Sequence, residues 1–234
     1  MKAIILAGGA GTRLRPVTYE IPKPLVPVKK KPILNHLIEL FAKHGVSDIA
    51  VLASREHEED FRRWQKAWHG EVPEVLVEYE DSPEGTFGGI RRLRGWIGDD
   101  HFLVSNGDEL KDFDIISIID FHKKEGAVGT LALVEVPDPH RYGVPTLPAG
   151  HKSGRVIKME EKPEHPSSNF VSAGFYVFSP EVFDYVPAKT FVMTELDISP
   201  RLAAEGKLAA MRMEGGRWYD CGTLERWEKA MNEW

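Results

Sequence analysis

A glycine-rich turn followed by two fixed cations is the part of this sequence whose residues could do chemistry. The apolar segment 2–6 runs into Ala-Gly-Gly-Ala-Gly-Thr-Arg, which ends at Arg13. Glycines let backbone N–H groups approach an anion closely, because no Cβ stands in the way. Arg13, and Lys23 between two prolines, add positive charge where a phosphate chain would lie. The segment is typical of a nucleotide-binding site.

Two better-known phosphate loops do not fit this turn. The dinucleotide-binding fingerprint needs a third glycine, but counted from Gly9 and Gly11 that position is Leu14. The P-loop needs a Gly-Lys-Ser/Thr run, but counted from Gly8 its place holds Arg13 without a Lys-Ser/Thr pair. The turn therefore belongs to another class of phosphate site.

Composition limits the kind of protein that could carry such a site. With 234 residues, of which 42% are hydrophobic, the chain can bury a full core in one large domain. A net charge of −6 argues against binding to nucleic acid, which depends on neutralising phosphates with Lys and Arg. The single cysteine, Cys221, and the absence of a signal-type or membrane-length apolar run favour a cytoplasmic location without membrane association.

Strand-like and helix-like segments alternate along the first half of the chain. Strands are expected at 2–6, 48–53, 75–79, 101–105 and 128–136, and helices at 32–43, 56–68, 85–96 and 115–124. This alternation predicts an α/β fold, Rossmann-like, with a mainly parallel central sheet and helices on both faces, in a single domain of residues 1–234. Ligands of such sheets bind beyond the carboxyl ends of the strands, where the glycine turn would lie.

The second half is less regular. Strands are expected at 155–160 and 171–178, helices at 196–205 and 223–232, and a loop at 137–154. No internal repeat is visible in the sequence. Trp64 and Trp68 share a helical stripe and suit a core or an interface equally, so the oligomeric state, including a homo-oligomer, stays open.

The N-terminal pattern, with Pro-Lys-Pro-Leu around Lys23, closely resembles the signature of the sugar nucleotidyltransferases, or NDP-sugar pyrophosphorylases. Further family-like motifs follow in order: Asn-Gly-Asp at 106–108, Tyr-Gly-Val at 142–144, Glu-Lys-Pro at 161–163, Val-Ser-Ala-Gly at 171–174 and Trp-Tyr-Asp-Cys-Gly-Thr at 218–223. The resemblance covers essentially the whole chain. It implies the nucleotide-diphospho-sugar transferase (GT-A-like) fold, with a nucleotide-binding part at about 1–125 and a sugar-phosphate-binding part at about 126–234. Some family members append hexapeptide repeats of a β-helix, but this sequence shows none, so no C-terminal β-helix is expected.

The resemblance also implies a reaction and a cofactor. The family joins a nucleoside triphosphate (NTP) and a sugar 1-phosphate into an NDP-sugar and pyrophosphate. It implies that Asp108 and Asp220 hold Mg²⁺, which prefers hard oxygen ligands and is commonly bound by one or two carboxylates plus substrate phosphates. Taken alone, an aspartate after a strand is an ordinary loop residue, and only the resemblance brings these two acids together.

Individual roles follow from the same resemblance. Arg13 is expected at the β- and γ-phosphates, Lys23 at the α-phosphate, and Lys162 at the sugar phosphate. The implied nucleotide-binding residues are Leu6, Ala7, Gly8, Gly9, Gly11, Thr12, Glu80, Gly85 and Thr86. The implied sugar-phosphate-binding residues are Asn106, Tyr142, Gly143, Glu161 and Ser172.

Two departures from the family pattern bear on the substrates. Ser172 stands where asparagine is usual, which puts that sugar contact in doubt, and Phe87 replaces a small residue in the base-reading segment. Carboxylates gather near this segment, at Glu80, Asp81 and Glu84. A carboxylate can accept both N1–H and N2–H of guanine, whereas thymine and uracil offer a single N–H, so these acids favour GTP. Solvent-facing loop acids are the alternative interpretation.

GTP with mannose 1-phosphate is the leading substrate pair on this interpretation. The alternatives are glucose 1-phosphate with dTTP, UTP or CTP, heptose 1-phosphate with GTP, another alcohol phosphate such as phosphocholine as acceptor, and a homologue that senses sugar nucleotides without making them. The expected partners are thus an NTP and a sugar 1-phosphate, with no nucleic-acid polymer and no membrane.

Overall fold

The chain divides into two units in the computed structural model, which describes residues 1–70 and 74–234. The glycine-turn unit comprises residues 2–83, 105–113 and 215–234. The β12 unit comprises residue 1 together with 84–104 and 114–214. Each unit is built from segments far apart in the sequence, and strand β6 (Phe102–Asn106) contributes residues to both.

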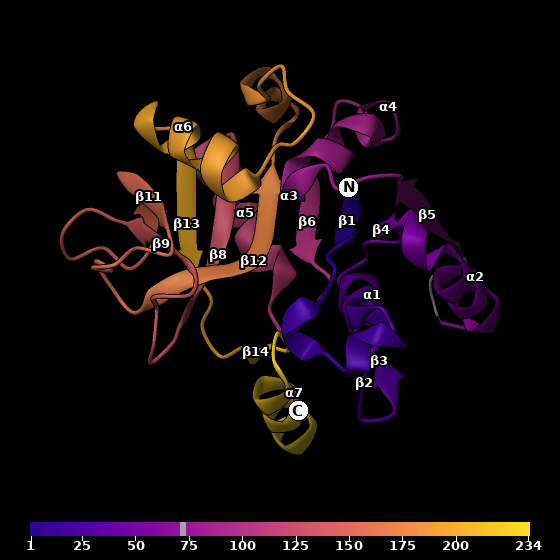
Figure 1. Ribbon diagram of the computed structural model, residues 1–234. Coiled ribbons are helices and arrows are strands. Elements are labelled where there is room, and N and C mark those ends of the chain that lie inside the picture. The colour runs from indigo at the N-terminus through magenta and orange to yellow at the C-terminus, as the bar shows by residue number, and fades with distance from the viewer. Residues whose placement is uncertain (71–73) are drawn as a thin grey trace. The chain divides into compact units, whose positions relative to one another are not determined.

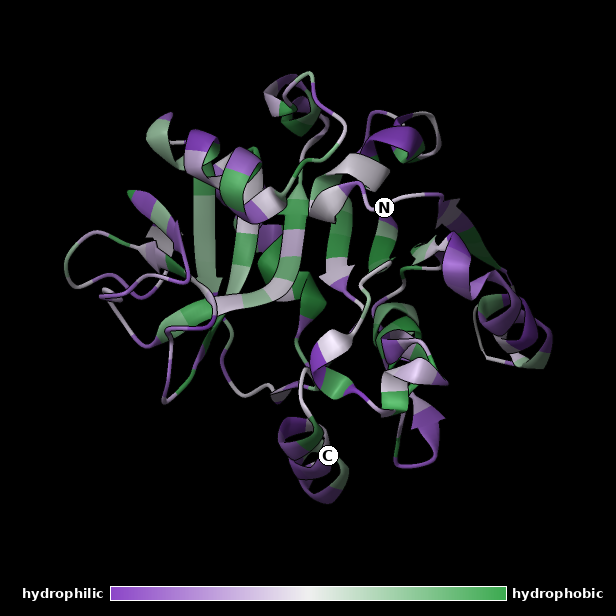
Figure 2. Ribbon diagram, viewed as in Figure 1, coloured by the Kyte–Doolittle hydropathy of each residue, from purple (hydrophilic) through white to green (hydrophobic). Residues whose placement is uncertain are grey.

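Parallel strands form the sheet of the glycine-turn unit. Strand β1 (Lys2–Ala7) pairs with β4 (Asp48–Ser54), and β4 pairs with β5 (Val75–Glu80), all in parallel. Strands β1 and β4 are mostly apolar and buried (Figure 2), as expected for parallel strands covered by helices. Their carboxyl ends bring Ala7, the residue before the glycine turn, beside Ala53 of β4.

The helices of this unit bury one apolar stripe each. Helix α1 (Ile33–Lys43) buries its isoleucines and leucines together with Phe41. Helix α2 (Glu58–Ala67) contacts β4 and β5 and buries Phe61 and Trp64, while its charged residues face outward (Figure 2). The predicted stripe of tryptophans therefore packs in the core through Trp64, whose indole N–H donates to Asn35 Oδ1 at 2.7 Å.

A short antiparallel ladder closes the glycine-turn unit. Strand β7 (Glu109–Lys111) pairs with β14 (Trp218–Asp220), and helix α7 (Leu224–Glu233) follows β14. The ladder joins two segments more than a hundred residues apart in sequence, so no local pattern predicts it. A two-residue ladder of β2 (Pro27–Val28) with β3 (Lys31–Pro32) precedes α1.

The β12 unit has its own strands, in the order β10-β13-β8-β12. Strand β8 (Gly129–Glu135) is parallel to β13 (Leu208–Arg212) and antiparallel to β12 (Phe170–Phe178). Strand β10 (Gly154–Arg155) pairs antiparallel with β13. The register of β12 shifts between Ser172 and Tyr176, which is the signature of a bulge.

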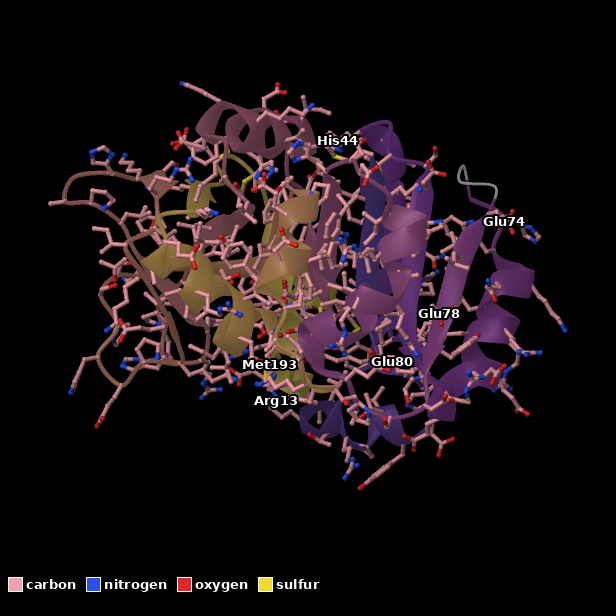
Figure 3. All side chains as sticks on the ribbon, turned by 90° about the horizontal axis from the view of Figure 1, so that it is seen from above. Arg13, His44, Glu74, Glu78, Glu80 and Met193 are labelled. Carbon is pink, nitrogen blue, oxygen red and sulfur yellow. The ribbon has the colours of Figure 1, made fainter. Side chains whose placement is uncertain are left out.

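Helices cover both faces of these strands. Helix α5 (Ile115–Glu125) packs on β8, β12 and β13, and α6 (Ser199–Ala204) packs on β13 from the other side (Figures 1 and 3). The segment before α6 contains the helical turns η6 (Pro180–Tyr185) and η7 (Thr194–Ile198). Helices on opposite faces of parallel strands agree with the predicted α/β class.

Two expected elements are wrong as continuous segments. The strand expected at 155–160 is two strands, because the chain changes partner: Val156 N–H bonds Leu208 O, whereas Ile157 N–H bonds Thr146 O. Strand β11 (Lys158–Glu161) then pairs with β9 (Gly143–Thr146), which lies inside the expected loop 137–154.

The helix expected at 85–96 is also interrupted. It consists of α3 (Gly85–Gly88), η5 (Gly89–Leu93) and α4 (Arg94–Ile97). The glycines in this segment carry the lowest helix propensity apart from proline, which accounts for the break. Across residues 1–70 and 74–234, no helix is long and apolar enough to span a membrane.

Candidate functional site

The glycine turn is held by its own contacts. Gly11 has a left-handed backbone (φ 61°), its carbonyl accepts the Thr18 hydroxyl at 2.8 Å, and a Cβ at Gly11 would lie 2.9 Å from Thr18 Cγ2. A Cβ at Gly8 would lie 2.6 Å from Glu80 Oε2. Around Gly9, in contrast, a Cβ would meet no atom within 4 Å. The backbone therefore requires glycine at position 11, the Glu80 carboxylate fills the space beside Gly8, and the space around Gly9 is open.

The flanking predicted residues extend this turn. Leu6 lies in β1 and its carbonyl accepts the backbone N–H of Gly107 at 2.8 Å, so the glycine turn and the Asn-Gly-Asp motif share a hydrogen bond. Thr12 and Arg13 open the turn η1 (Thr12–Leu14), and both are exposed. A Cβ built on Gly222 would lie 3.5 Å from Arg13 Nη2, which places the guanidinium beside the Trp-Tyr-Asp-Cys-Gly-Thr motif.

Lys23 and Asp108 form an ion pair. Lys23 begins the turn η3 (Lys23–Leu25) between Pro22 and Pro24, is 7% exposed, and directs its ammonium to Asp108 Oδ2. Burial by itself would raise the pKa of Asp108, but the adjacent Lys23 charge lowers that pKa below its usual value. The carboxylate is thus ionised at neutral pH and already neutralised by a cation.

The ladder of β7 and β14 brings the two predicted metal ligands together. Asp220 is the register partner of Glu109, the residue after Asp108, and Cys221 N–H donates to Asp108 O at 3.2 Å. Asp220 Oδ1 accepts Gly222 N–H at 2.6 Å, and its other oxygen pairs with Arg226 on α7. The convergence of Asp108 and Asp220, which the resemblance alone implied, is therefore a feature of the structure.

The lone cysteine, Cys221, is buried beside the two acids. Burial raises the pKa of the Cys221 thiol to about 12, and the carboxylates of Asp220 and Asp108 act in the same direction. A thiol of that pKa is protonated at neutral pH and is a poor nucleophile. Its side chain is fully buried and directly follows Asp220 in the sequence.

Glu80 lies directly against the glycine turn. It is the last residue of β5, is 9% exposed, and its carboxylate reaches the space beside Gly8. Glu78 shares the same face of β5, two residues earlier (Figure 3). Of the acids near the base-reading segment, Glu80 is the one that the fold places beside the turn, whereas Asp81 is exposed and pairs with Arg55.

Two of the residues implied for the sugar phosphate, Gly143 and Glu161, lie on strands β9 and β11 of the β12 unit, and Tyr142 and Lys162 lie directly beside them in the sequence. Gly143 is the register partner of Glu161, and a Cβ at Gly143 would lie 3.1 Å from Glu161 Oε2 and 3.8 Å from Ser172 Cβ. Lys162 has φ 49°, its N–H donates to Tyr142 O at 3.0 Å, and its ammonium lies 3.0 Å from Glu161 Oε1. A carboxylate and an exposed ammonium thus share one end of a ladder that glycine keeps open.

Ser172, the departure from the usual asparagine, is buried on β12. Its hydroxyl lies 3.3 Å from the Tyr176 hydroxyl and accepts Gly174 N–H at 3.4 Å. Asn106, the remaining residue implied for the sugar phosphate, belongs to the glycine-turn unit and donates its side-chain N–H to Glu109 Oε1 at 3.0 Å.

The predicted nucleotide-binding pair Gly85 and Thr86 is held by backbone contacts of its own unit. Gly85 has φ 80°, and a Cβ there would collide with Val192 O. The Thr86 hydroxyl donates to Glu195 Oε2 at 2.7 Å and accepts Thr194 N–H at 2.8 Å. The Thr86 hydroxyl therefore joins helix α3 to the start of η7.

Four charged residues escaped the sequence analysis. They are Glu109, Lys111, Glu195 and Arg226. The alternation of charge in Glu-Leu-Lys at 109–111, directly after Asp108, was the available signal for the first two. Burial raises the pKa of Glu195, and the nearby Glu161 charge acts in the same direction. Nothing in the local sequence marks Arg226.

Comparison with known proteins decides the family. The sequence model of the family described as "Nucleotidyl transferase" matches residues 2–234. The chain belongs to the nucleotidyl transferase family. It is 36% identical over 224 residues to the mannose-1-phosphate guanylyltransferase catalytic subunit beta of Xenopus tropicalis, covering 95% of this chain and 61% of that protein. It is also 36% identical to the mannose-1-phosphate guanylyltransferase of Mycobacterium tuberculosis, again with 95% and 61% covered.

A solved structure supports the same conclusion. A putative glucose-1-phosphate thymidylyltransferase from Bacillus anthracis superposes with a TM-score of 0.89 at 27% identity, covering 99% of this chain and 94% of that one. The predicted fold class and family resemblance are therefore confirmed. The chain spans about three fifths of the length of the curated relatives that it matches, 61%.

A nucleotidyl transferase of this kind would need a divalent ion, and the acids of the β7–β14 ladder fit one. Asp108 and Asp220 offer hard carboxylate oxygens from neighbouring positions of paired strands. Among residues 1–70 and 74–234, no cluster of His, Cys, Asp and Glu supplies a complete metal shell by itself. Mg²⁺ suits such a site, because it usually keeps several waters and shares one or two carboxylates with substrate phosphates.

Proposed function

We propose that this chain transfers a nucleotidyl group from an NTP to a sugar 1-phosphate and releases pyrophosphate. The observation that carries the proposal is the pairing of β7 with β14, which places Asp108 and Asp220 at neighbouring positions with Lys23 on the first. The names of the relatives agree with this activity. The chain covers only 61% of the length of these curated relatives, so their names do not by themselves assign the activity to it. The proposal therefore depends on the residues that this chain contains.

The reaction asks little covalent chemistry of the protein. An oxygen of the sugar phosphate attacks the α-phosphorus, a new P–O bond forms, and the bond from the α-phosphorus to the bridging oxygen of pyrophosphate breaks. Positioning and charge neutralisation supply most of the acceleration in transfers of this type. The chain's cations match that need. Arg13 would hold the β- and γ-phosphates that leave, Lys23 would neutralise charge at the α-phosphate, and Lys162 would hold the attacking phosphate.

Mg²⁺ is the proposed cofactor, held by Asp108 and Asp220. When bound, such an ion supplies Lewis-acid activation of the phosphates. The ion pairs Lys23–Asp108 and Arg226–Asp220 would then rearrange, which frees the Lys23 ammonium for the nucleotide.

The proposed substrates are GTP and mannose 1-phosphate. Glu80 is 9% exposed with its carboxylate beside Gly8, which supports a role in which its two oxygens would accept the N1–H and N2–H of guanine in charge-assisted hydrogen bonds. Glu161 would bind a sugar hydroxyl beside the phosphate that Lys162 holds. The mannose-1-phosphate guanylyltransferases among the relatives support this pair.

Glucose 1-phosphate with dTTP is the second candidate. It is favoured by one specific observation, the match to a putative glucose-1-phosphate thymidylyltransferase over 99% of this chain. Heptose 1-phosphate with GTP shares the base and differs in the sugar. The cytoplasmic location and the absence of nucleic-acid and membrane partners stay predictions, as does the division at about residue 125.

A substrate matrix tests the proposal. Purified protein is mixed with Mg²⁺, with each of ATP, GTP, CTP, UTP and dTTP, and with mannose, glucose or heptose 1-phosphate, and pyrophosphate release is followed. We expect the fastest release with GTP and mannose 1-phosphate, and none without Mg²⁺. Activity with dTTP but not GTP would overturn the base assignment, and no release in any mixture would favour a sensing role.

A further inference from the structure

Strand β7 carries a buried ion pair, Glu109 with Lys111, directly after Asp108 in the sequence and opposite Asp220 in the ladder. Lys111 Nζ is 2.8 Å from Glu109 Oε2, and the two side chains are 0% and 10% exposed. Between them on β7 stands Leu110, fully buried. A lysine without any exposed side-chain surface is rare in proteins unless it is paired, so Glu109 is essential to its presence here.

Glu109 is the centre of a network that joins the two strands. Its Oε1 accepts the side-chain N–H of Asn106 at 3.0 Å, and its Oε2 accepts the indole N–H of Trp218 at 3.0 Å as well as the Lys111 ammonium. Trp218 is the register partner of Lys111, and Asp220 is the register partner of Glu109. One carboxylate therefore links the side chains of Asn106 and Lys111, which flank Asp108 in the sequence, with that of Trp218, two residues before Asp220.

Stability alone does not account for this pair. Replacing a buried ion pair with apolar residues of similar volume is often neutral or stabilising, whereas removing one partner is strongly destabilising. The Lys111 charge, after that of Lys23, lowers the pKa of Asp108. Without Glu109, the Lys111 ammonium would have Asp108 as an available counter-ion.

We propose that Glu109 and Lys111 are positioning residues for the divalent ion that the proposed function assigns to Asp108 and Asp220. Glu109 holds the Lys111 ammonium on its own carboxylate and fixes β14 through Trp218, so that both aspartates remain available to the ion. This inference rests on the proposed function, because the proposed function supplies the position of the ion at Asp108 and Asp220.

Charge-removing variants of the pair test the proposal. Mn²⁺ binding is measured from the electron paramagnetic resonance of the free ion, and the Mg²⁺ activation constant is measured from pyrophosphate release. Glu109→Gln should weaken both by about 10- to 100-fold, the range seen when groups that support metal ligands are lost. The KM for the sugar 1-phosphate should stay close to the wild-type value. The double variant Glu109→Gln/Lys111→Met removes the stray ammonium and should return both metal constants towards wild type.

Control variants separate positioning from folding. Val51→Ala opens a cavity in β4 of the same unit and should lower the unfolding free energy without changing Mn²⁺ affinity. Trp218→Phe keeps a ring but removes one donor to Glu109, and serves as a milder test should Glu109→Gln not fold. Unchanged Mn²⁺ affinity in the folded Glu109 or Trp218 variants would overturn the proposal.

The same assay distinguishes failure of this inference from failure of the proposed function. Asp220→Asn should abolish measurable Mn²⁺ binding. If the wild-type protein binds Mn²⁺ and Asp220→Asn binds it equally well, the ion is not on this aspartate, and both the inference and the metal assignment are wrong. If Asp220→Asn loses the ion and Glu109→Gln retains it, only the inference is wrong.

Discussion

The two units hold their carboxylates in different ways. In the glycine-turn unit the two acids of the ladder and Asp108, which directly precedes β7, each face a cation: Asp108 with Lys23, Glu109 with Lys111, and Asp220 with Arg226. In the β12 unit, Glu195 is held by the Thr86 hydroxyl, and Glu161 has an exposed Lys162 as its neighbour. In the first arrangement, a metal ion could replace the cations on the aspartates, and the released cations could then bind a polyphosphate. The second suits the recognition of hydroxyl groups.

This contrast predicts that changes in the two units affect different kinetic constants. Under the proposed function, charge in the glycine-turn unit would act where charge develops during the reaction, so its loss should lower kcat. Hydrogen bonds of the β12 unit would act on the bound sugar, so their loss should raise KM.

The largest effect is expected from the ladder and its cation. Lys23→Ala or Asp220→Asn should lower turnover by about 10³-fold, because each removes charge stabilisation at the reacting phosphates. Pyrophosphate release measures the loss, and circular dichroism checks folding. Glu39→Gln, which removes an exposed carboxylate paired with Lys31 in the same unit, is the matched control and should keep wild-type turnover. Near-normal rates in the Lys23 or Asp220 variants would remove the contrast between the units.

Glu161→Ala tests the other side of the comparison. Loss of a charge-assisted hydrogen bond to a hydroxyl should raise the KM for the sugar 1-phosphate by about 10- to 100-fold. The KM for GTP should change little. Glu160→Ala is the control, since Glu160 lies one residue earlier on β11 and pairs with Lys158 instead. An equal effect of the two variants would show that Glu161 has no special place at the sugar.

His122 allows a test, through the pH dependence of stability, of whether the β12 unit holds a buried neutral histidine by hydrogen bonds. It is buried, lies 2.8 Å from the Thr130 hydroxyl and 3.0 Å from His101, and burial lowers its pKa to about 4. Above the unfolded value of 6.5 its contribution to stability is complete, and it is lost as the pH falls from 6.5 towards 4, because only the unfolded chain binds the proton.

The expected loss at His122 is about 2 kcal/mol of unfolding free energy between pH 7 and pH 5. Urea unfolding of the wild type and His122→Gln at both pH values measures it, with the variant showing a flatter dependence. Exposed His165→Gln is the control and should behave like wild type. A parallel pH dependence of the wild type and His122→Gln would contradict a buried, neutral His122.

The smallest effect is expected in base selection. Glu80→Gln exchanges one acceptor of the carboxylate for a donor, so the preference for GTP over dTTP should fall by about tenfold. The ratio of kcat/KM for the two nucleotides measures the change. Glu78→Gln, on the same face of β5, should leave the ratio unchanged (Figure 3). A GTP preference that survives Glu80→Gln would place base reading elsewhere.

Local patterns predicted the elements and family motifs predicted the candidate site. The parallel strands β1 and β4 were predicted because each contains an apolar run between turns, and β5 was predicted from its apolar residues 75–77 and Tyr79. Strands β7 and β14 could not be, since three residues carry no periodicity and their pairing depends on segments more than a hundred residues apart. The resemblance supplied Asp108 and Asp220, but not the supporting pair Glu109 and Lys111.

The β12 unit shows a second reason why sequence reasoning falls short. Thr86 stays a predicted nucleotide-binding residue, but the motif did not predict that its hydroxyl bonds Glu195 and Thr194, which stand more than a hundred residues later. A hydroxyl can donate only one hydrogen bond, and tertiary structure rather than the local motif determines which acceptor takes it. Likewise, the break after Arg155 follows from a change of neighbouring strand that the apolar run 156–157 conceals.

The most direct test of the account is to locate the divalent ion in a crystal grown with Mn²⁺ and GTP. Anomalous scattering should give one peak within about 2.0–2.2 Å of carboxylate oxygens from both Asp108 and Asp220, with Lys23 turned towards the α-phosphate. A peak elsewhere, with Asp108 still on Lys23 and Asp220 still on Arg226 while the nucleotide is bound, would contradict it.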